Sequence, residues 1–494
     1  MKNFIKIVAL SVAIVVVLCS CGSLSDGNAN RFKWAKGIFV EGSKKDTGDK
    51  KAVSDDTEKD SDDEYFYDDE DTPFENTSVS NNATNVSSNT SGQGNDNGNT
   101  SKPTEPTNNT PKEIVNVENV IREEAIALRL NETVLERSIV NVGDMTRVAN
   151  VIKKAVRGEP VTIGAIGGSI TEGTGASPTS NRYADRFKTW WANTFPDSQL
   201  TYINAGIGAT DSLVGVHRAE ADILNKNPDL VIVDFSVNDS ASNATIYRES
   251  YESLIRRILK KSNNPAVICV CMFNETGESV QTIHAQVAKH NNVPMVSYKD
   301  AVWPQNGAKV YAWSEIGADN VHPNNTGHAV ISELLIYYIN TVRAKLTEIS
   351  ETVAPLGEPL TESGFENGVL YTNQTLTASS LGSFKLTNNA FRQFKMGWTV
   401  SGGTNPIEFQ FKNAKSIYLL YRKYTSNSGG TVALELDGNV VGSANADFAG
   451  GWGEYATFEK ILDSNTASDH VVKLRLTSDS PKTDFAILGM MVSY

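Results

Sequence analysis

Five apolar runs of strand length recur through the middle of the chain, separated by stretches long enough to form helices. The runs cover residues 161–167, 200–206, 229–235, 266–272 and 293–298. Strands that are apolar along their whole length are typical of a parallel sheet with helices on both faces. This alternation predicts a doubly wound α/β domain over residues 158–348, closed by a long helix from about Asn325.

The pattern changes after about residue 355, where short alternating runs replace the helical periodicity. The run from Val432 to Leu436 leads into Asp437-Gly438, a pair that favours a tight hairpin turn. Short alternating strands joined by turn residues are typical of β-sandwiches. The sequence therefore predicts an all-β, jelly-roll-like sandwich over residues 361–494.

Residues 113–157 precede the α/β domain and contain two patterns with helical spacing. The first covers residues 113–130 and the second covers residues 144–156. We expect this N-terminal helical segment to pack on the domain that follows it.

Residues 1–21 place Lys2 and Lys6 before an apolar stretch, which is the layout of a secretory signal peptide. The stretch ends in the residues Leu-Cys-Ser-Cys-Gly at 18–22, which resemble a bacterial lipobox. This resemblance implies cleavage before Cys21 and lipidation of that cysteine. An uncleaved membrane anchor is the alternative. The first interpretation predicts a protein held by lipid on the extracellular face of a bacterial cell membrane.

Residues 22–112 contain too few apolar side chains to offset the entropy of ordering the chain. Fourteen acidic and three basic residues between Asp46 and Glu75 supply −11 of the formal net charge of −13. We expect a disordered, self-repelling tether. Because the remaining chain is nearly neutral, the composition argues against a nucleic-acid partner.

Only two cysteines, Cys269 and Cys271, fall within the predicted folded region. They are two residues apart in an apolar run, so on a strand they share one face. We expect them to be inert core residues rather than a disulfide or a pair of metal ligands.

Polar residues and glycines follow several of the predicted strands. Ser169 comes after Gly167 and Gly168, Gly208 follows the second strand, and Asn238 follows the third. The carboxyl ends of parallel strands meet at one edge of a sheet, where functional groups collect. These residues supply a hydroxyl nucleophile, a glycine whose N–H group a ligand can approach closely, and a side-chain amide.

Asp319 and His322 lie three residues apart in one loop after the fifth strand. A carboxylate at this spacing can orient the imidazole and stabilise its charge, as in a serine hydrolase triad. Asp319, His322 and His328 could instead bind a metal, but the paired-histidine helix pattern of zinc hydrolases is missing from the sequence.

These blocks, in this order, resemble the SGNH (GDSL-type) hydrolases over about residues 160–345. The resemblance implies a flavodoxin-like sheet, a nucleophile at Ser169, and a general base at His322 that Asp319 orients and stabilises. It also implies an oxyanion hole built from Ser169, Gly208 and Asn238, with no metal or other cofactor. One departure is that Gly168 stands where the Gly-Asp-Ser form of the family has aspartate.

Several other residues have structural interpretations. We expect at least one of the adjacent Trp190 and Trp191 to be a core residue. Arg218 and Asp222, four residues apart, should form a structural pair. We expect three histidines to be solvated or capping residues: His217, His284 and His290. Glu172 could bond locally or assist catalysis. Trp452 and Tyr455 could form a sugar-stacking surface, although such aromatic side chains are more often core residues.

The combined interpretation is a surface-tethered serine esterase that removes small acyl groups, acetyl above all, from polysaccharide. A lipase or aryl-esterase, or an acyltransferase, would use the same residues. A non-catalytic glycan-binding lipoprotein is the alternative of another class. The polysaccharide preference rests on the tether, the appended sandwich and the similarity to carbohydrate acetyl esterases.

Overall fold

The computed structural model describes residues 112–494 except for residues 363 and 478–481. The predicted signal peptide, the lipidated Cys21 and nearly all of the tether lie outside the described residues and stay predictions. Within the described ranges, none of the helices combines the length and the apolar character needed to cross a membrane.

Six strands of the described residues form the sheet of the first domain, in the order β1-β6-β5-β4-β2-β3. The parallel strands are β2 (Val161–Gly167), β3 (Leu200–Gly206), β4 (Leu230–Asp234), β5 (Ala266–Cys271) and β6 (Met295–Ser297). Counted from β2, their order is the flavodoxin-like order 2-1-3-4-5. The predicted doubly wound α/β fold is therefore confirmed.

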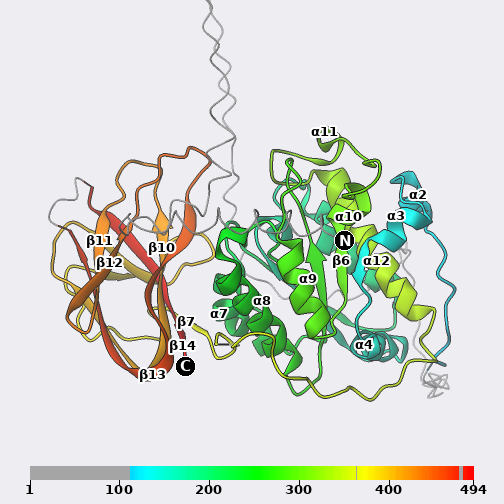
Figure 1. Cartoon of the computed structure of the whole chain (residues 1–494), viewed down its shortest axis with the longest axis horizontal. Helices are drawn as coiled ribbons and strands as arrows, with labels where there is room; N and C mark the ends of the chain where they lie inside the picture. Colours follow the sequence, from blue (N-terminus) through cyan, green and yellow to red (C-terminus); the bar gives the residue numbers. More distant parts are fainter. Residues whose placement is uncertain (1–111, 363, 478–481) are drawn as a thin grey trace, which may run out of the picture. The chain divides into compact units, whose positions relative to one another are not determined.

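Helices cover both faces of this sheet. One face carries α4 (Thr146–Val156), α6 (Tyr183–Thr194) and α12 (Asn325–Arg343), and the other carries α7 (Ser212–Asp222), α8 (Ala244–Leu259) and α9 (Gln281–His290). Figure 1 labels several helices of this domain, among them α8, α9 and α12. Successive residues of β5 alternate between two apolar cores: Ile268 faces the first, whereas Cys269 and Cys271 face the second. Both cysteines are buried and free, as predicted. Trp190 and Trp191 are both core residues of α6.

Short helices complete the described part of the first domain. They are α2 (Glu123–Ala127), α3 (Glu132–Arg137), α5 (Ser169–Glu172), α10 (Tyr298–Val302) and α11 (Trp313–Ile316), with 3-10 turns at η1 (Thr179–Asn181), η2 (Leu224–Lys226) and η3 (Ala241–Asn243).

The N-terminal segment differs from its predicted helical form. Its second pattern forms α4, but residues 113–122 are not helical and only the short α2 follows them. Residues 115–120 include β-branched and asparagine residues, which have low helix propensity, and Val120 remains 61% exposed. Hydrogen bonds to the end of α12, such as Val117 N to Arg343 O at 3.1 Å, hold the segment instead. An additional strand, β1 (Ile139–Asn141), pairs antiparallel with β6.

The C-terminal domain is all β and antiparallel, as predicted. Its described strands are β7 (Val369–Tyr371), β8 (Lys385–Thr387), β9 (Gly397–Ser401), β10 (Ile407–Lys423), β11 (Thr431–Leu436), β12 (Asn439–Asn445), β13 (Tyr455–Leu476) and β14 (Asp484–Ser493). Asp437 and Gly438 both have positive φ (50° and 85°) and join β11 to β12, which confirms the predicted turn.

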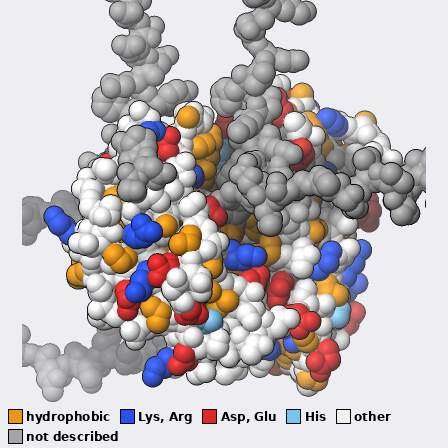
Figure 2. All heavy atoms as spheres, turned by 60° about the vertical axis from the view of Figure 1, so that its left-hand side comes forward, with side chains coloured by type: hydrophobic (Ala, Val, Ile, Leu, Met, Phe, Trp, Pro, Cys, Tyr) orange, Lys and Arg blue, Asp and Glu red, His pale blue; other side chains and the backbone are white. Residues whose placement is uncertain are grey.

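On the face shown in Figure 2, acidic and basic side chains are interspersed.

The two domains share an apolar core. Residues of the C-terminal domain, among them Phe365, Tyr418 and Phe458, belong to the same buried cluster as α7 and α8. His217 of α7 lies in this contact: its Nε2 is 3.0 Å from Ser493 Oγ and its Nδ1 is 2.7 Å from Leu213 O. The prediction that His217 is solvated or capping was wrong, because His217 lies inside α7 and the second domain buries it to 2% exposure.

The burial of His217 predicts acid sensitivity. Burial lowers the pKa of His217 to about 4, although its hydrogen bond to the Leu213 carbonyl opposes this shift. In the unfolded chain a histidine titrates near 6.5, so between pH ~6.5 and ~4 the unfolded state binds the proton and folding is disfavoured. Stability is thus fully present above pH ~6.5 and falls as the pH drops toward ~4, by at most about 3 kcal/mol from this residue.

We expect His217→Gln to flatten the loss of unfolding free energy over this pH range, measured by urea denaturation at successive pH values. His290→Gln is the matched control, because it replaces a histidine that is exposed on α9, and its curve is compared with that of the wild type. Equal slopes for the wild type and His217→Gln would contradict the prediction.

Candidate functional site

The carboxyl ends of three neighbouring strands are in register at one edge of the sheet. Gly167 at the end of β2 pairs with Gly206 of β3 on one side and with Asp234 of β4 on the other. Because β3 and β4 pair with opposite sides of β2, the loops that follow the three strands begin next to one another at this edge, where ligands bind in open α/β sheets. Ser169, Gly208 and Asn238 lie on these three loops.

Ser169 is the first residue of α5, one turn of helix that begins directly after β2. Gly168 precedes it in an extended conformation, and Gly173 ends the helix with φ of 109°. N–H groups in the first turn of a helix have no partner within that helix. The turn therefore presents both the hydroxyl and the backbone N–H of Ser169 at the edge of the sheet.

The structure brings Ser169, His322 and Asp319 together. Ser169 Oγ lies 2.8 Å from His322 Nε2, and His322 Nδ1 lies 2.7 Å from Asp319 Oδ2. These are hydrogen-bond distances between a nucleophile, a base and an orienting carboxylate. The arrangement allows His322 to accept the serine proton while Asp319 fixes the orientation of the ring.

Asp319 is held in a backbone turn. Its Oδ1 accepts the N–H groups of Val321 at 2.7 Å and His322 at 2.8 Å, which leaves Oδ2 for the imidazole. Burial by itself raises the pKa of the Asp319 carboxyl, but the hydrogen bonds and charge of His322 outweigh it, so the pKa lies below its usual range. The carboxylate is therefore ionised where a general base must act.

Gly208 and Asn238 both lie beside the serine. A β-carbon added to Gly208 would stand 3.8 Å from Ser169 Cβ, and one added to Gly168 would stand 2.1 Å from Asn238 Oδ1. The departure at Gly168 from the Gly-Asp-Ser form thus has a local reason, because any side chain there would displace Asn238. Backbone N–H groups and a side-chain amide that surround a nucleophile can stabilise an oxyanion.

The Arg218 side chain links the ends of β2 and β3 at this edge of the sheet. It is 1% exposed, and its guanidinium donates to Ala205 O at 2.7 Å and to Gly167 O at 2.9 Å. Its predicted structural pair with Asp222 is confirmed at 2.7 Å. The sequence indicated the ion pair but not that Arg218 also joins the ends of β2 and β3.

His328 makes structural hydrogen bonds near the site. Its Nδ1 accepts the Tyr183 N–H at 3.2 Å and its Nε2 lies 3.2 Å from Thr174 O, so both ring nitrogens contact backbone groups. Burial lowers the pKa of His328 to about 4, which keeps the ring neutral. These contacts account for His328 without the metal ligation that the sequence left open.

A second Ser-His-Asp array lies on the C-terminal domain. Ser468 Oγ is 2.8 Å from His470 Nε2, and His470 Nδ1 is 2.8 Å from Asp437 Oδ2. Ser468 is an exposed residue within β13, where it pairs with Ala414 of β10. It follows neither a glycine turn nor a helix start that would direct N–H groups at its hydroxyl. The three distances alone therefore do not distinguish a catalytic site.

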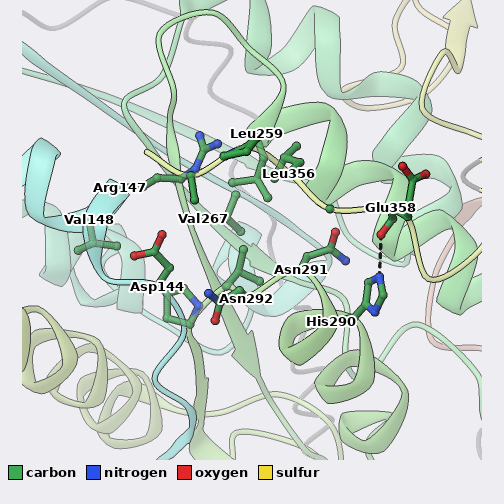
Figure 3. Close-up of a pocket in the computed structure, with 15 residues that line it drawn as sticks. Asp144, Arg147, Val148, Leu259, Val267, His290, Asn291, Asn292, Leu356 and Glu358 are labelled. Carbon is green, nitrogen blue, oxygen red and sulfur yellow. Dashed lines mark hydrogen bonds between the residues drawn. The ribbon is translucent and has the colours of Figure 1, made fainter. Parts of the chain in front are cut away.

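A pocket elsewhere in the first domain lies apart from these groups (Figure 3). It is lined by Asp144, Arg147, His290 and residues of the connection to the second domain, where His290 Nε2 lies 2.8 Å from Glu358 O. None of the residues predicted for catalysis lines this pocket. We therefore place the candidate active site at Ser169.

The C-terminal domain reaches this site. Gln393, between β8 and β9, donates to Glu172 Oε1 at 2.6 Å, three residues after Ser169. The Oε2 atom of the same carboxylate would stand 2.8 Å from a β-carbon on Gly208. Glu172 thus bonds across the domain contact; no sequence pattern links it to a residue 221 positions away.

Comparisons with known proteins identify a family and similar solved structures. Residues 165–330 match the GDSL-like lipase/acylhydrolase family. The chain is similar to a two-domain esterase active on acetylated mannans, at 33% identity and a TM-score of 0.67, over 73% of this chain and 98% of that chain. A structure of such an esterase co-crystallized with mannopentaose matches at 32% identity and a TM-score of 0.66, over 73% of this chain and 97% of that one. No curated protein matches.

The crowding at Gly168 gives a direct test of the Asn238 geometry. Gly168→Ala forces the Asn238 side chain away from Ser169, and loss of one oxyanion donor lowers kcat about 100-fold. Stability should change little, because the backbone of Gly168 has φ of −87°, which alanine also adopts. The measurements are p-nitrophenyl acetate kinetics and the melting temperature.

Gly442→Ala is the matched control, since a β-carbon there would meet only Leu434 Cδ1 at 3.8 Å. Unchanged kcat in Gly168→Ala would show that Asn238 does not need its observed position.

Proposed function

The chain belongs to the GDSL-like lipase/acylhydrolase family and is an ester-bond hydrolase, and we propose that it removes acetyl groups from an acetylated polysaccharide. The observation that carries the proposal is the likeness to a two-domain esterase active on acetylated mannans, which extends over 98% of that chain. Acetylated mannan is therefore the first substrate to test.

In the proposed mechanism Ser169 is the nucleophile. His322 takes the proton from Ser169 Oγ as the oxygen attacks the acetyl carbonyl, and Asp319 stabilises the imidazolium that forms. The sugar hydroxyl then leaves with a proton from His322, and the acetyl group stays on Ser169. A water molecule, deprotonated by His322, releases acetate and restores the serine.

The negative charge of each tetrahedral intermediate develops on the former carbonyl oxygen. We assign its stabilisation to the N–H groups of Ser169 and Gly208 and to the amide of Asn238. Donors that are already in place cost no reorganisation during the reaction, and each contributes on the order of 3 kcal/mol in comparable oxyanion holes.

The C-terminal domain supports the choice of a polymeric substrate. From Gln393 at the active site, the chain runs back to Phe391, whose ring lies 5.0 Å from the guanidinium of Arg422. Arg422 Nε donates to Glu454 at 2.9 Å, and Trp452 stands two residues before Glu454. Together with the short stretches of chain between them, these contacts link Glu172 to the segment that carries the exposed Trp452.

Trp452 has the form of a sugar-stacking residue. Its side chain is 44% exposed, while Tyr455 is buried and supports it by ring stacking at 4.6 Å. Tryptophan is enriched at binding interfaces, because its ring offers a large apolar face and its N–H can donate a hydrogen bond. We propose that Trp452 contacts sugar units remote from the scissile ester, whereas Tyr455 is a core residue.

The first test compares the two serine arrays. Ser169→Ala should abolish acetate release from acetylated mannan and hydrolysis of p-nitrophenyl acetate, a loss of about 10⁴-fold or more. Ser468→Ala is the matched control and should retain both activities, because Ser468 follows neither a glycine turn nor a helix start. Turnover retained in folded Ser169→Ala would overturn the mechanism. Faster hydrolysis of p-nitrophenyl octanoate than of the acetate would favour a lipase.

The second test separates glycan contact from chemistry. Trp452→Ala should raise KM for acetylated mannan several-fold and leave p-nitrophenyl acetate hydrolysis unchanged, because remote contacts bind the polymer without touching the reacting atoms. Val440→Ala, at an exposed position on β12, serves as the control. Equal KM values for mannan in the wild type and Trp452→Ala would refute the stacking role.

A further inference from the structure

Asp239 and His284 are buried ionisable residues next to the candidate active site, and the proposed mechanism uses neither of them. Both side chains are 0% exposed, and Asp239 Oδ2 lies 2.8 Å from His284 Nε2. His284 belongs to α9 and stacks on Tyr251 with a centroid distance of 3.6 Å. The expectation that His284 is solvated or capping was wrong, because α8 and α9 enclose it.

Asp239 joins the two loops that carry the oxyanion donors. It follows Asn238 directly in the chain, and its Oδ1 accepts the N–H of Ser212, the first residue of α7, at 2.8 Å. The loop that ends at Ser212 is the loop that contains Gly208. A single carboxylate therefore fixes the Asn238 turn, the end of the Gly208 loop and helix α9 relative to one another.

The Gly208 loop needs such support. Ala209 has φ of 58°, in the left-handed region, which costs a residue with a β-carbon on the order of 1–2 kcal/mol. Strained residues of this kind persist only where the surrounding structure holds them, and they cluster at functional sites. Thr210 Oγ1 donates to Ile207 O at 2.7 Å inside the loop, and Asp239 anchors the end of the loop.

The choice of residues favours a geometric role over a purely stabilising one. Apolar side chains of similar volume often replace a buried ion pair without loss of stability. They could not accept the N–H of Ser212, however, so the link between the two loops would be lost. Burial raises the pKa of the Asp239 carboxyl, although its contact with His284 acts in the opposite direction.

We propose that Asp239, oriented by His284, is a positioning residue that holds Gly208 and Asn238 at the spacing an oxyanion requires. This inference rests on the proposed oxyanion role of those two residues. Because the oxyanion charge develops only as the bond forms, misplaced donors lower kcat and leave KM nearly unchanged.

The experiment measures p-nitrophenyl acetate kinetics of the full chain with Asp239→Leu and, separately, His284→Gln. Leucine has a similar size but no acceptor for the N–H of Ser212, so we expect kcat to fall about 10- to 100-fold, with KM within twofold of the wild-type value. His290→Gln, on the exposed side of the same helix α9, is the matched control and should keep wild-type kcat. Wild-type kcat in folded Asp239→Leu and His284→Gln would overturn the proposal.

A double-mutant cycle with Asn238→Ala distinguishes positioning from general damage. If Asp239 acts through the donors, Asp239→Leu should lower kcat at least threefold less in the Asn238→Ala background than in the wild type, because coupled residues are not additive. Losses that multiply would refute the proposal. Should Asp239→Leu fail to fold, His284→Gln, which keeps an amide facing the carboxylate, takes its place in the cycle. Wild-type kcat in Asn238→Ala alone would instead refute the oxyanion assignment.

Discussion

The parallel pairing of β2 with β3 on one side and β4 on the other is the constraint on which the site depends. It places Gly167, Gly206 and Asp234 in one register, so that three loops begin at the same height on one edge of the sheet. Each loop then needs only a few residues to bring Ser169, Gly208 or Asn238 into contact. The base arrives separately, on the loop before α12, and meets the serine at 2.8 Å.

Buried polar side chains convert this register into fixed distances. Arg218 joins the carbonyls at the ends of β2 and β3, and Asp239 joins the loops that follow β3 and β4. Neither side chain faces solvent, and both make hydrogen bonds to other segments of the chain. A buried charge without such partners would be costly, so these groups tolerate little movement of the loops they connect.

The two Ser-His-Asp arrays show why distances alone do not make a hydrolase. Both arrays have hydrogen bonds of 2.7 to 2.8 Å between their three members. Only Ser169 stands at the start of a helix, beside a glycine loop and a side-chain amide. Ser468 lies within β13 and starts no helix that would direct N–H groups at an oxyanion. Stabilisation of the oxyanion is usually the largest single contribution to catalysis.

The sequence by itself determined the strand runs, the all-β second domain, and the set Ser169, Gly208, Asn238, Asp319 and His322, because periodicity and local spacing record these features directly. It did not determine that residues 113–122 are non-helical, since their conformation depends on hydrogen bonds to α12. It also misplaced His217 and His284: a lone histidine carries no sign of burial, and only the packing of α7 against the second domain and of α9 against α8 removes them from water. The links from Asp239 to His284 and from Glu172 to Gln393 join residues 45 and 221 positions apart. Contacts at such separations arise when the sheet and the two domains pack together, so tertiary structure alone decided them.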